Sequence, residues 1–132
     1  SDLKNAYGVS VGGTYVEISI NQQHMWYYKN GKLVVETDVV TGNYGTNDTP
    51  KGAYSIIYKA SPATLMLNSH VTFWLPFTSD GCGIHDASWR SSWEYGGTRY
   101  KGHGSHGCVN TPYNAAKKIY NNISSGTRVV VY

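Results

Sequence analysis

The chain has 132 residues, a length that fits one domain with a core large enough to be stable without disulfides. The net charge is only +3 and the eleven Lys and Arg residues are scattered singly, which argues against nucleic acid as a partner. Charged residues and aromatic residues each make up 14% of the chain, and with fifteen glycines this mixture is typical of many short strands joined by tight turns.

No apolar run approaches the roughly 20 residues that a membrane-spanning helix needs, and no secretory leader is recognisable. The chain begins abruptly at Ser1. We therefore expect a monomeric single domain, residues 1–132, excised from a longer secreted protein and without a transmembrane segment of its own.

The first part of the chain predicts antiparallel strands. Thr14–Ile20 alternates apolar and polar residues, which is typical of a half-buried strand. His24–Lys29 and Lys32–Val40 flank Asn30-Gly31, the strongest short signal for a hairpin. We expect three antiparallel strands to open the domain.

Further strands alternate with loops. Residues 41–52 are rich in Gly, Asn and Asp and predict a loop. Ala53–Lys59 and His70–Phe77 predict strands, the second ending at a sheet edge because of its proline. Between them, Ser61–Ser69 is compatible with a short helical turn or with a segment crossing under the core.

One helix is predicted near the C-terminus. Thr111 is expected as its N-cap and Pro112 as its first residue, with an apolar stripe at i, i+4 and i+8 and a stop at Gly126. Thr127–Tyr132 then predicts a central strand. The sequence therefore indicates a mainly β fold with one helix packed on it.

The segment Ser105-His106-Gly107-Cys108-Val109-Asn110 has the features of a nucleophile turn. A reactive cysteine needs dipoles or positive charge that favour the thiolate, and the N-terminus of the predicted helix would supply them. Gly104 and Gly107 would let the backbone bend and its amides converge on an oxyanion. The alternatives are a buried structural cysteine or a disulfide with Cys82. We favour a free Cys108 and interpret Cys82 as a small buried hydrophobe.

A nucleophilic cysteine needs a basic partner, and the chain has five histidines. His85 follows a predicted strand end and precedes Asp86, so we expect it to be the general base. His106 has two interpretations, a buried ring that holds the turn or a direct role. The others are interpreted as structural or surface residues: His24, His70 and His103.

A zinc site built from His85, His103, His106 and Cys108 is a rival hypothesis, because histidine and cysteine are the usual zinc ligands. The spacing matches no familiar zinc pattern. We expect neither a metal nor a cofactor.

The stretch from Asp86 to Gly104 contains several aromatic residues among serines and glycines and predicts a long surface loop. The loop is interpreted as a lid over a substrate, with packing against the sheet as the alternative. Its candidate substrate-binding residues are Trp89, Trp93, Tyr95 and Tyr100.

These segments together resemble a known family. Gly83-Ile84-His85 followed by Ser105–Asn110 resembles the signature of L,D-transpeptidase catalytic domains, the YkuD family, whose pattern is Ser/Thr-His-Gly-Cys-hydrophobic-Asn. Gly42 and Thr49-Pro50-Lys51-Gly52 also resemble family segments, so the likeness covers nearly the whole chain. Two departures are visible: Asp86 stands where the family often has glycine or serine, and the spacing from His85 to Ser105 is longer than in many members.

The resemblance implies a mainly β, sandwich-like fold of mixed sheets and an enzyme that crosslinks peptidoglycan stem peptides. By the same resemblance, Cys108 is the nucleophile, His85 its partner, and the backbone carbonyl of Asp86 orients the imidazole. The amides of His106, Gly107 and Cys108 form the oxyanion hole, and Ser105 and Asn110 shape the site and contact substrate.

The resemblance also implies a location and inhibitors. The enzyme is expected outside the cytoplasm, at the cell wall of a Gram-positive bacterium, and is expected to be acylated by carbapenems. Two alternatives stay open: a cysteine hydrolase of stem peptides, of the L,D-carboxypeptidase type, and a non-catalytic wall-binding module.

Overall fold

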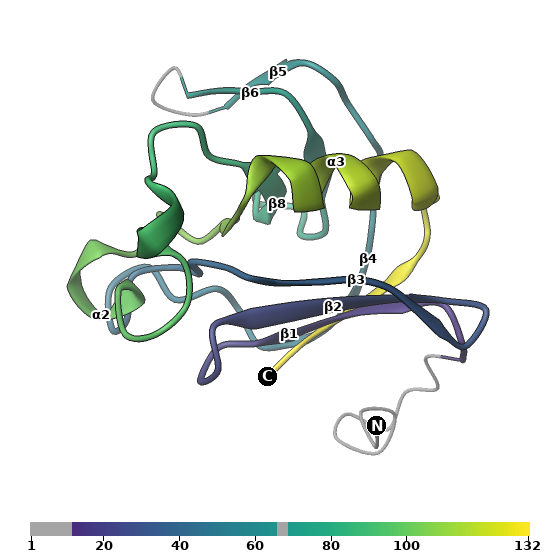
Figure 1. The fold of residues 1–132 in the computed structure, drawn as a ribbon, viewed down its shortest axis with the longest axis horizontal. Coiled ribbons are helices and arrows are strands. Elements are labelled where there is room, and N and C mark those ends of the chain that lie inside the picture. The colour runs from purple at the N-terminus through teal and green to yellow at the C-terminus, as the bar shows by residue number, and fades with distance from the viewer. Residues whose placement is uncertain (1–11, 66–68) are drawn as a thin grey trace.

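A computed structural model describes residues 12–65 and 69–132 of the chain. A twisted five-stranded sheet forms one layer, and helix α3 (Tyr113–Asn122) lies across it (Figure 1). The strands of this sheet are, in spatial order, β3 (Lys32–Asp38), β2 (His24–Lys29), β1 (Tyr15–Ser19), β10 (Arg128–Val131) and β4 (Gly52–Ser55).

A second sheet carries the segments that resemble the family signature. Its order is β7 (Trp74–Pro76), β8 (Gly83–Asp86) and β9 (Val109–Thr111), with β7 antiparallel and β9 parallel to β8. A small hairpin of β5 (Ala63–Thr64) and β6 (His70–Val71) stands apart from both sheets, and two short helices follow β8: η2 (Ser92–Glu94) and α2 (Tyr100–His103). The mainly β fold with mixed sheets that the sequence predicts is therefore confirmed.

The predicted opening hairpin is present. β1, β2 and β3 pair antiparallel, and both turn residues have positive φ, +53° at Asn30 and +80° at Gly31. This is the type I′ geometry that Asn-Gly adopts at low cost. β10 lies between β1 and β4, the central position predicted for the last strand.

β1 is not half-buried as predicted, because both of its faces are covered. Tyr15, Glu17 and Ser19 are all less than 10% exposed although they alternate with the core residues. The Tyr15 ring stacks on Tyr28 with centroids 5.0 Å apart, and the Tyr132 hydroxyl donates to Glu17 Oε2 at 2.5 Å. Aromatic side chains from neighbouring strands thus cover a face that alternation alone assigns to water.

The predicted strand 70–77 is interrupted. β6 and β7 are separate because the amides of Thr72 and Phe73 donate to the Asp86 carboxylate, at 2.8 to 3.1 Å, and so leave the ladder. The predicted strand 53–59 is likewise shorter, since β4 ends at Ser55. For the ambiguous segment 61–69, the structure shows β5 at its start, and residues 66–68 lie outside the described residues.

The helix boundaries differ from the prediction at both ends. Thr111 belongs to β9 and Pro112, with ψ of 142°, is the N-cap, so α3 begins one residue later than expected. At the other end α3 stops at Asn122, before Gly126, because Ile123 takes an extended conformation with ψ of 150°. Lysine side chains then satisfy the carbonyl groups at this end: Lys29 Nζ donates to Asn122 O and Lys59 Nζ to Ile123 O, each at 2.9 Å. Within the described ranges, the longest helix is too short and too polar to cross a bilayer.

Candidate active site

A cleft of about 620 Å³ opens at the ends of β8 and β9. Both predicted motifs contribute to it, together with the start of the aromatic loop and residues of the β5 to β7 region. Its walls include His85, Trp89, Ser105, His106, Cys108 and Asn110. The structure therefore brings the cysteine and the predicted base to one cavity.

The parallel pairing of β8 with β9 explains this convergence. His85 lies opposite Asn110 in the register, and the neighbouring pair, Ile84 and Val109, is fully buried in the core. Because side chains alternate along a strand, the residues on either side of that core pair face the other way, toward the cleft. The register thus places the two motifs side by side although a long loop separates them in sequence.

His85 has the orientation that a base requires. Its Nδ1 lies 2.6 Å from the carbonyl oxygen of Asp86, and a carbonyl can only accept, so Nδ1 carries the proton and Nε2 has the lone pair. The ring sits between Trp74 and Trp89, with centroid distances of 5.9 and 5.8 Å. Burial among these groups lowers the pKa of His85 below its ordinary value, so the imidazole is neutral at pH 7.

Cys108 is held against the turn that precedes β8. Its thiol donates to Gly81 O at 3.5 Å, and the amide of Gly83 donates to its sulfur. Burial raises the pKa of the Cys108 thiol to about 11. The resting group is therefore a thiol that needs a base, and not a preformed thiolate.

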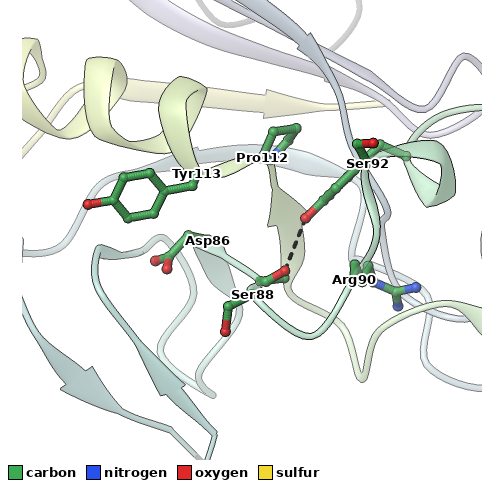
Figure 2. Close-up of a pocket in the computed structure, with 8 residues that line it drawn as sticks. Asp86, Ser88, Arg90, Ser92, Pro112 and Tyr113 are labelled. Carbon is green, nitrogen blue, oxygen red and sulfur yellow. Dashed lines mark hydrogen bonds between the residues drawn. The ribbon is translucent and has the colours of Figure 1, made fainter.

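The expectation that the helix N-terminus stabilises the thiolate is wrong. β9 separates Cys108 from α3, and the first turn of α3 lies at a different, smaller cavity of about 230 Å³. Figure 2 shows Pro112 and Tyr113 at that cavity, across from Asp86 and Ser88.

Cys82 is half-buried and packs against the hydrophobic core, but it also lines the cleft beside Cys108. Both cysteines are free, so the structure holds no disulfide between them. Burial raises the pKa of Cys82 as well. The interpretation of Cys82 as a core residue alone is therefore incomplete.

The turn before Cys108 is shaped by Ser105 and Gly107. Gly107 has φ of +124°, a conformation that L side chains rarely adopt. Its amide donates to Ser105 Oγ at 3.2 Å, and that hydroxyl in turn donates to the Cys108 carbonyl. His106 is exposed and lines the cleft, which excludes the interpretation of its ring as a buried support.

Gly104 serves a different purpose from the predicted one. Its φ of −73° is open to any residue, but a Cβ there would lie 2.5 Å from the Asn43 Cα. The glycine therefore permits close contact between the end of the aromatic loop and the loop after β3.

Thr49 supports the nucleophile turn through its buried hydroxyl. Its hydroxyl donates to Gly107 O at 2.8 Å and accepts from the Gly42 amide at 2.9 Å, and the residue is 1% exposed. In the sequence, Thr49 belongs to the Thr-Pro-Lys-Gly segment that resembles the family, but this resemblance gives no role for its hydroxyl.

Replacing Thr49 with valine is expected to lower the free energy of unfolding by about 1–3 kcal/mol, because two buried backbone groups lose their partner. Urea denaturation measures this change. Thr46, which is exposed in the same loop, is the matched control, and its valine variant should change stability by about 0.5 kcal/mol or less. Equal losses in both variants would contradict the supporting role of Thr49.

The carboxylate of Asp86 is engaged away from the cleft. It accepts the two backbone amides that interrupt strand 70–77, and it lines the smaller cavity (Figure 2). Only its carbonyl faces His85. The side chain therefore anchors the chain, and its backbone oxygen orients the imidazole.

The four aromatic residues predicted to bind substrate separate into different environments. Trp89 is 52% exposed and lines the cleft. Tyr95 lines the smaller cavity and donates to Ala87 O at 3.2 Å. Trp93 is 70% exposed, lies under the Arg99 guanidinium and lines neither of these two cavities, and Tyr100 is 3% exposed in the core. The structure thus supports Trp89 as a cleft residue and corrects the expectation for Tyr100.

The remaining histidines are not among the residues that line the cleft. His24 contacts Asp38 and Glu36 on the sheet, His70 contacts Thr64, and His103 is exposed at the end of α2. His103 is not among the cleft residues, so the structure does not assemble the four ligands of the zinc hypothesis.

Sequence reasoning missed Arg90. Its side chain is 8% exposed and lines the cleft, but in the sequence it is only one of many scattered basic residues. Its nearby partner Glu94 gives no hint of the cleft, and its other partners, His103 and Asn110, are distant in the chain.

The family profile of the L,D-transpeptidase catalytic domain, YkuD, matches residues 13–131. A comparison with curated protein sequences gives no significant match. Among solved structures, a mutant of the L,D-transpeptidase from Enterococcus faecium is 39% identical with a TM-score of 0.83, over 92% of this chain and 50% of that one. The catalytic domain of the E. faecium enzyme acylated by ertapenem is 38% identical with a TM-score of 0.76, over 93% of this chain and 99% of that one.

An avibactam carbamoyl enzyme, Ldtfm, is 40% identical with a TM-score of 0.84, over 92% of this chain and 49% of that one. The chain thus spans about half the length of two of these structures and almost all of the isolated catalytic domain. Sequence profile, fold and identity agree, and the chain belongs to the L,D-transpeptidase (YkuD) catalytic-domain family.

Proposed function

We propose that this domain joins peptidoglycan stem peptides by thiol acyl transfer, with Cys108 as nucleophile and His85 as general base. The observation that carries the proposal is the shared cleft, which holds a partly buried thiol and a neutral imidazole whose Nδ1 is fixed on the Asp86 carbonyl. No cofactor is needed for this chemistry.

The first half-reaction is the acylation of Cys108 by a donor tetrapeptide stem. His85 Nε2 takes the thiol proton as the sulfur attacks the carbonyl carbon of the third residue, and the tetrahedral oxyanion is stabilised by backbone amides of the nucleophile turn. The imidazolium then protonates the leaving amine, the amide bond breaks, and D-Ala departs. The Gly107 amide already donates to Ser105, so the amides of His106 and Cys108 are the better candidates for the oxyanion.

The second half-reaction transfers the acyl group to an amine of an acceptor stem. His85 accepts a proton from the attacking amine, the thioester bond breaks, and the thiol is restored. The product is a crosslink from the third residue of the donor. Trp89, which borders both His85 and the cleft, would limit the access of competing water.

Product analysis tests this proposal. Purified disaccharide tetrapeptides are incubated with the enzyme and analysed by mass spectrometry. Crosslinked dimers that lack one D-Ala support transpeptidation. Tripeptide alone would favour the hydrolase, and unchanged substrate with binding to wall polymer would favour the non-catalytic module.

Acylation by a carbapenem is a further expected result, by analogy with the ertapenem-acylated E. faecium domain. Intact-mass measurement should show one adduct, and peptide mapping should place it on Cys108. The Cys82→Ala variant is the matched control, because it removes the other thiol of the same cleft and should still be acylated. An adduct confined to Cys82 would contradict the assignment of the nucleophile.

We also propose that the enzyme works outside the cytoplasm, at the cell wall of a Gram-positive bacterium, because its proposed substrates are stem peptides of the wall. Fractionation of the source cells tests this location. Recovery of the protein in the cytoplasmic fraction alone would contradict it.

A further inference from the structure

Arg90 is a buried cation that lines the cleft and that the proposed mechanism does not use. Its side chain is only 8% exposed, and arginine is seldom buried to this extent unless it is paired. It lines both cavities, and Figure 2 shows its guanidinium turned away from Asp86 and Ser88. The guanidinium therefore finds its partners elsewhere than at Asp86 and Ser88.

The guanidinium joins three separate parts of the chain. Nη2 donates to the carbonyl of His103 at 2.9 Å, and Nη1 lies 3.5 Å from Glu94 Oε1. The side-chain amide of Asn110 is oriented so that both its oxygen and its nitrogen have hydrogen-bond partners. In this orientation Asn110 Oδ1 accepts from Arg90 Nε at 2.7 Å and from Arg90 Nη2 at 3.3 Å. One side chain thus ties the start, the middle and the end of the aromatic loop to β9.

The residues that Arg90 holds are neighbours of the base. Asn110 is 2% exposed and lies opposite His85 in the strand register. Trp89, which precedes Arg90 in the chain, has its ring 5.8 Å from the His85 ring. A shift of the guanidinium would therefore move two walls of the cleft around His85.

We propose that Arg90 is a positioning residue, which fastens the aromatic loop to β9 and thereby sets the places of Asn110 and Trp89 around His85. The inference rests on the proposed function, since its main readout is acyl transfer. A planar fork with several donors is required, because the acceptors belong to three segments, and a lysine ammonium is a point charge that lacks this geometry.

The test compares Arg90→Gln with Arg99→Gln. Arg99 belongs to the same loop, and its side chain lies 3.6 Å from the same Glu94 carboxylate and over the Trp93 ring. It contacts His103 only through its backbone carbonyl, which a substitution keeps, so the Arg99 side chain is a matched control. Dimer formation is measured well below the midpoint of thermal unfolding, where a loss of stability alone leaves kcat/KM unchanged. Hydrogen exchange of residues 88–103 is measured in the same samples.

For Arg90→Gln we expect kcat/KM to fall at least about tenfold, from the loss of hydrogen bonds to a charged group, and exchange in the loop to rise. Arg90→Lys should not restore activity, whereas Arg99→Gln should stay within about threefold of the wild type. If Arg90→Gln does not fold, the activity and hydrogen exchange of Arg90→Lys are compared with those of Arg99→Gln instead.

Three results would overturn the inference: activity of Arg90→Gln within about threefold of the wild type, full rescue by lysine, or an equal loss in Arg99→Gln. A wild-type protein that forms no dimers would instead refute the proposed function. In that case hydrogen exchange still tests the role of Arg90. Unchanged exchange of the loop in Arg90→Gln would alone refute the proposal that Arg90 fastens the loop.

Discussion

Replacing Cys108 with alanine is expected to abolish the formation of crosslinked muropeptide dimers. The rate should fall at least about 10⁴-fold, because no sulfur is left to form the thioester with the acyl group. Release of D-Ala should stop as well, since both half-reactions pass through the same thioester. Mass spectrometry of the muropeptide products measures both effects. Stability should change little, because Cys108 is only partly buried and lines the cleft.

The control for this variant is Cys82→Ala. Cys82 lines the same cleft and packs against the core, so its replacement tests whether the loss of any thiol from this region impairs the enzyme. We expect Cys82→Ala to keep most of the activity. If Cys108→Ala still forms dimers, the mechanism proposed here is wrong.

Replacing His85 with glutamine is expected to reduce the rate of acylation by about 10²- to 10⁴-fold, the usual contribution of a general base. Glutamine preserves much of the volume between Trp74 and Trp89 but cannot take the thiol proton. The rate of carbapenem acylation, followed by intact mass, measures the loss without interference from the second half-reaction.

The pH dependence separates a base from a merely structural histidine. The pKa of His85 is lowered by burial, so wild-type kcat/KM should rise with pH to a plateau that is reached below the range expected for an ordinary histidine. In His85→Gln this acid limb should disappear. The residual rate should instead climb toward the thiol pKa of about 11, because only thiolate formed by solvent then reacts. An unchanged acid limb in the variant would show that another group titrates.

Both halves of the site could be predicted from the sequence because each is a short local pattern. The segment around Cys108 and the strand end at His85 have residue types that the chemistry needs, and the family resemblance relates them to each other. What brings them together is the parallel pairing of β8 and β9, a long-range contact with no local signal.

The environment of the site could not be predicted in the same way. The pKa of Cys108 depends on how deeply the sulfur is buried, and the helix that was expected to favour the thiolate begins beyond a further strand. Thr111 looks like an N-cap in sequence, but its place opposite Asp86 draws it into β9. Tertiary pairing thus overrides a local capping preference.

For the aromatic loop, composition could not predict which aromatic side chains line the cleft. Trp89 and Tyr100 have similar surroundings in sequence, yet one lines the cleft and the other is in the core. Arg90 carries no sequence signature, and the family-like segment that contains Thr49 gives no role for its hydroxyl. Both roles come from hydrogen bonds to segments far along the chain: Arg90 binds β9 and the end of the aromatic loop, and Thr49 binds the nucleophile turn. Such roles are visible only when the segments are seen together.

The most direct measurement is to trap the acyl-enzyme. The wild-type protein is mixed with a donor tetrapeptide stem in the absence of an acceptor amine, quenched in acid and mapped by mass spectrometry. We expect a thioester, lacking D-Ala, on the peptide that contains Cys108, and its removal by hydroxylamine. A donor that is turned over with no adduct on Cys108, or with the adduct on Cys82, would contradict it.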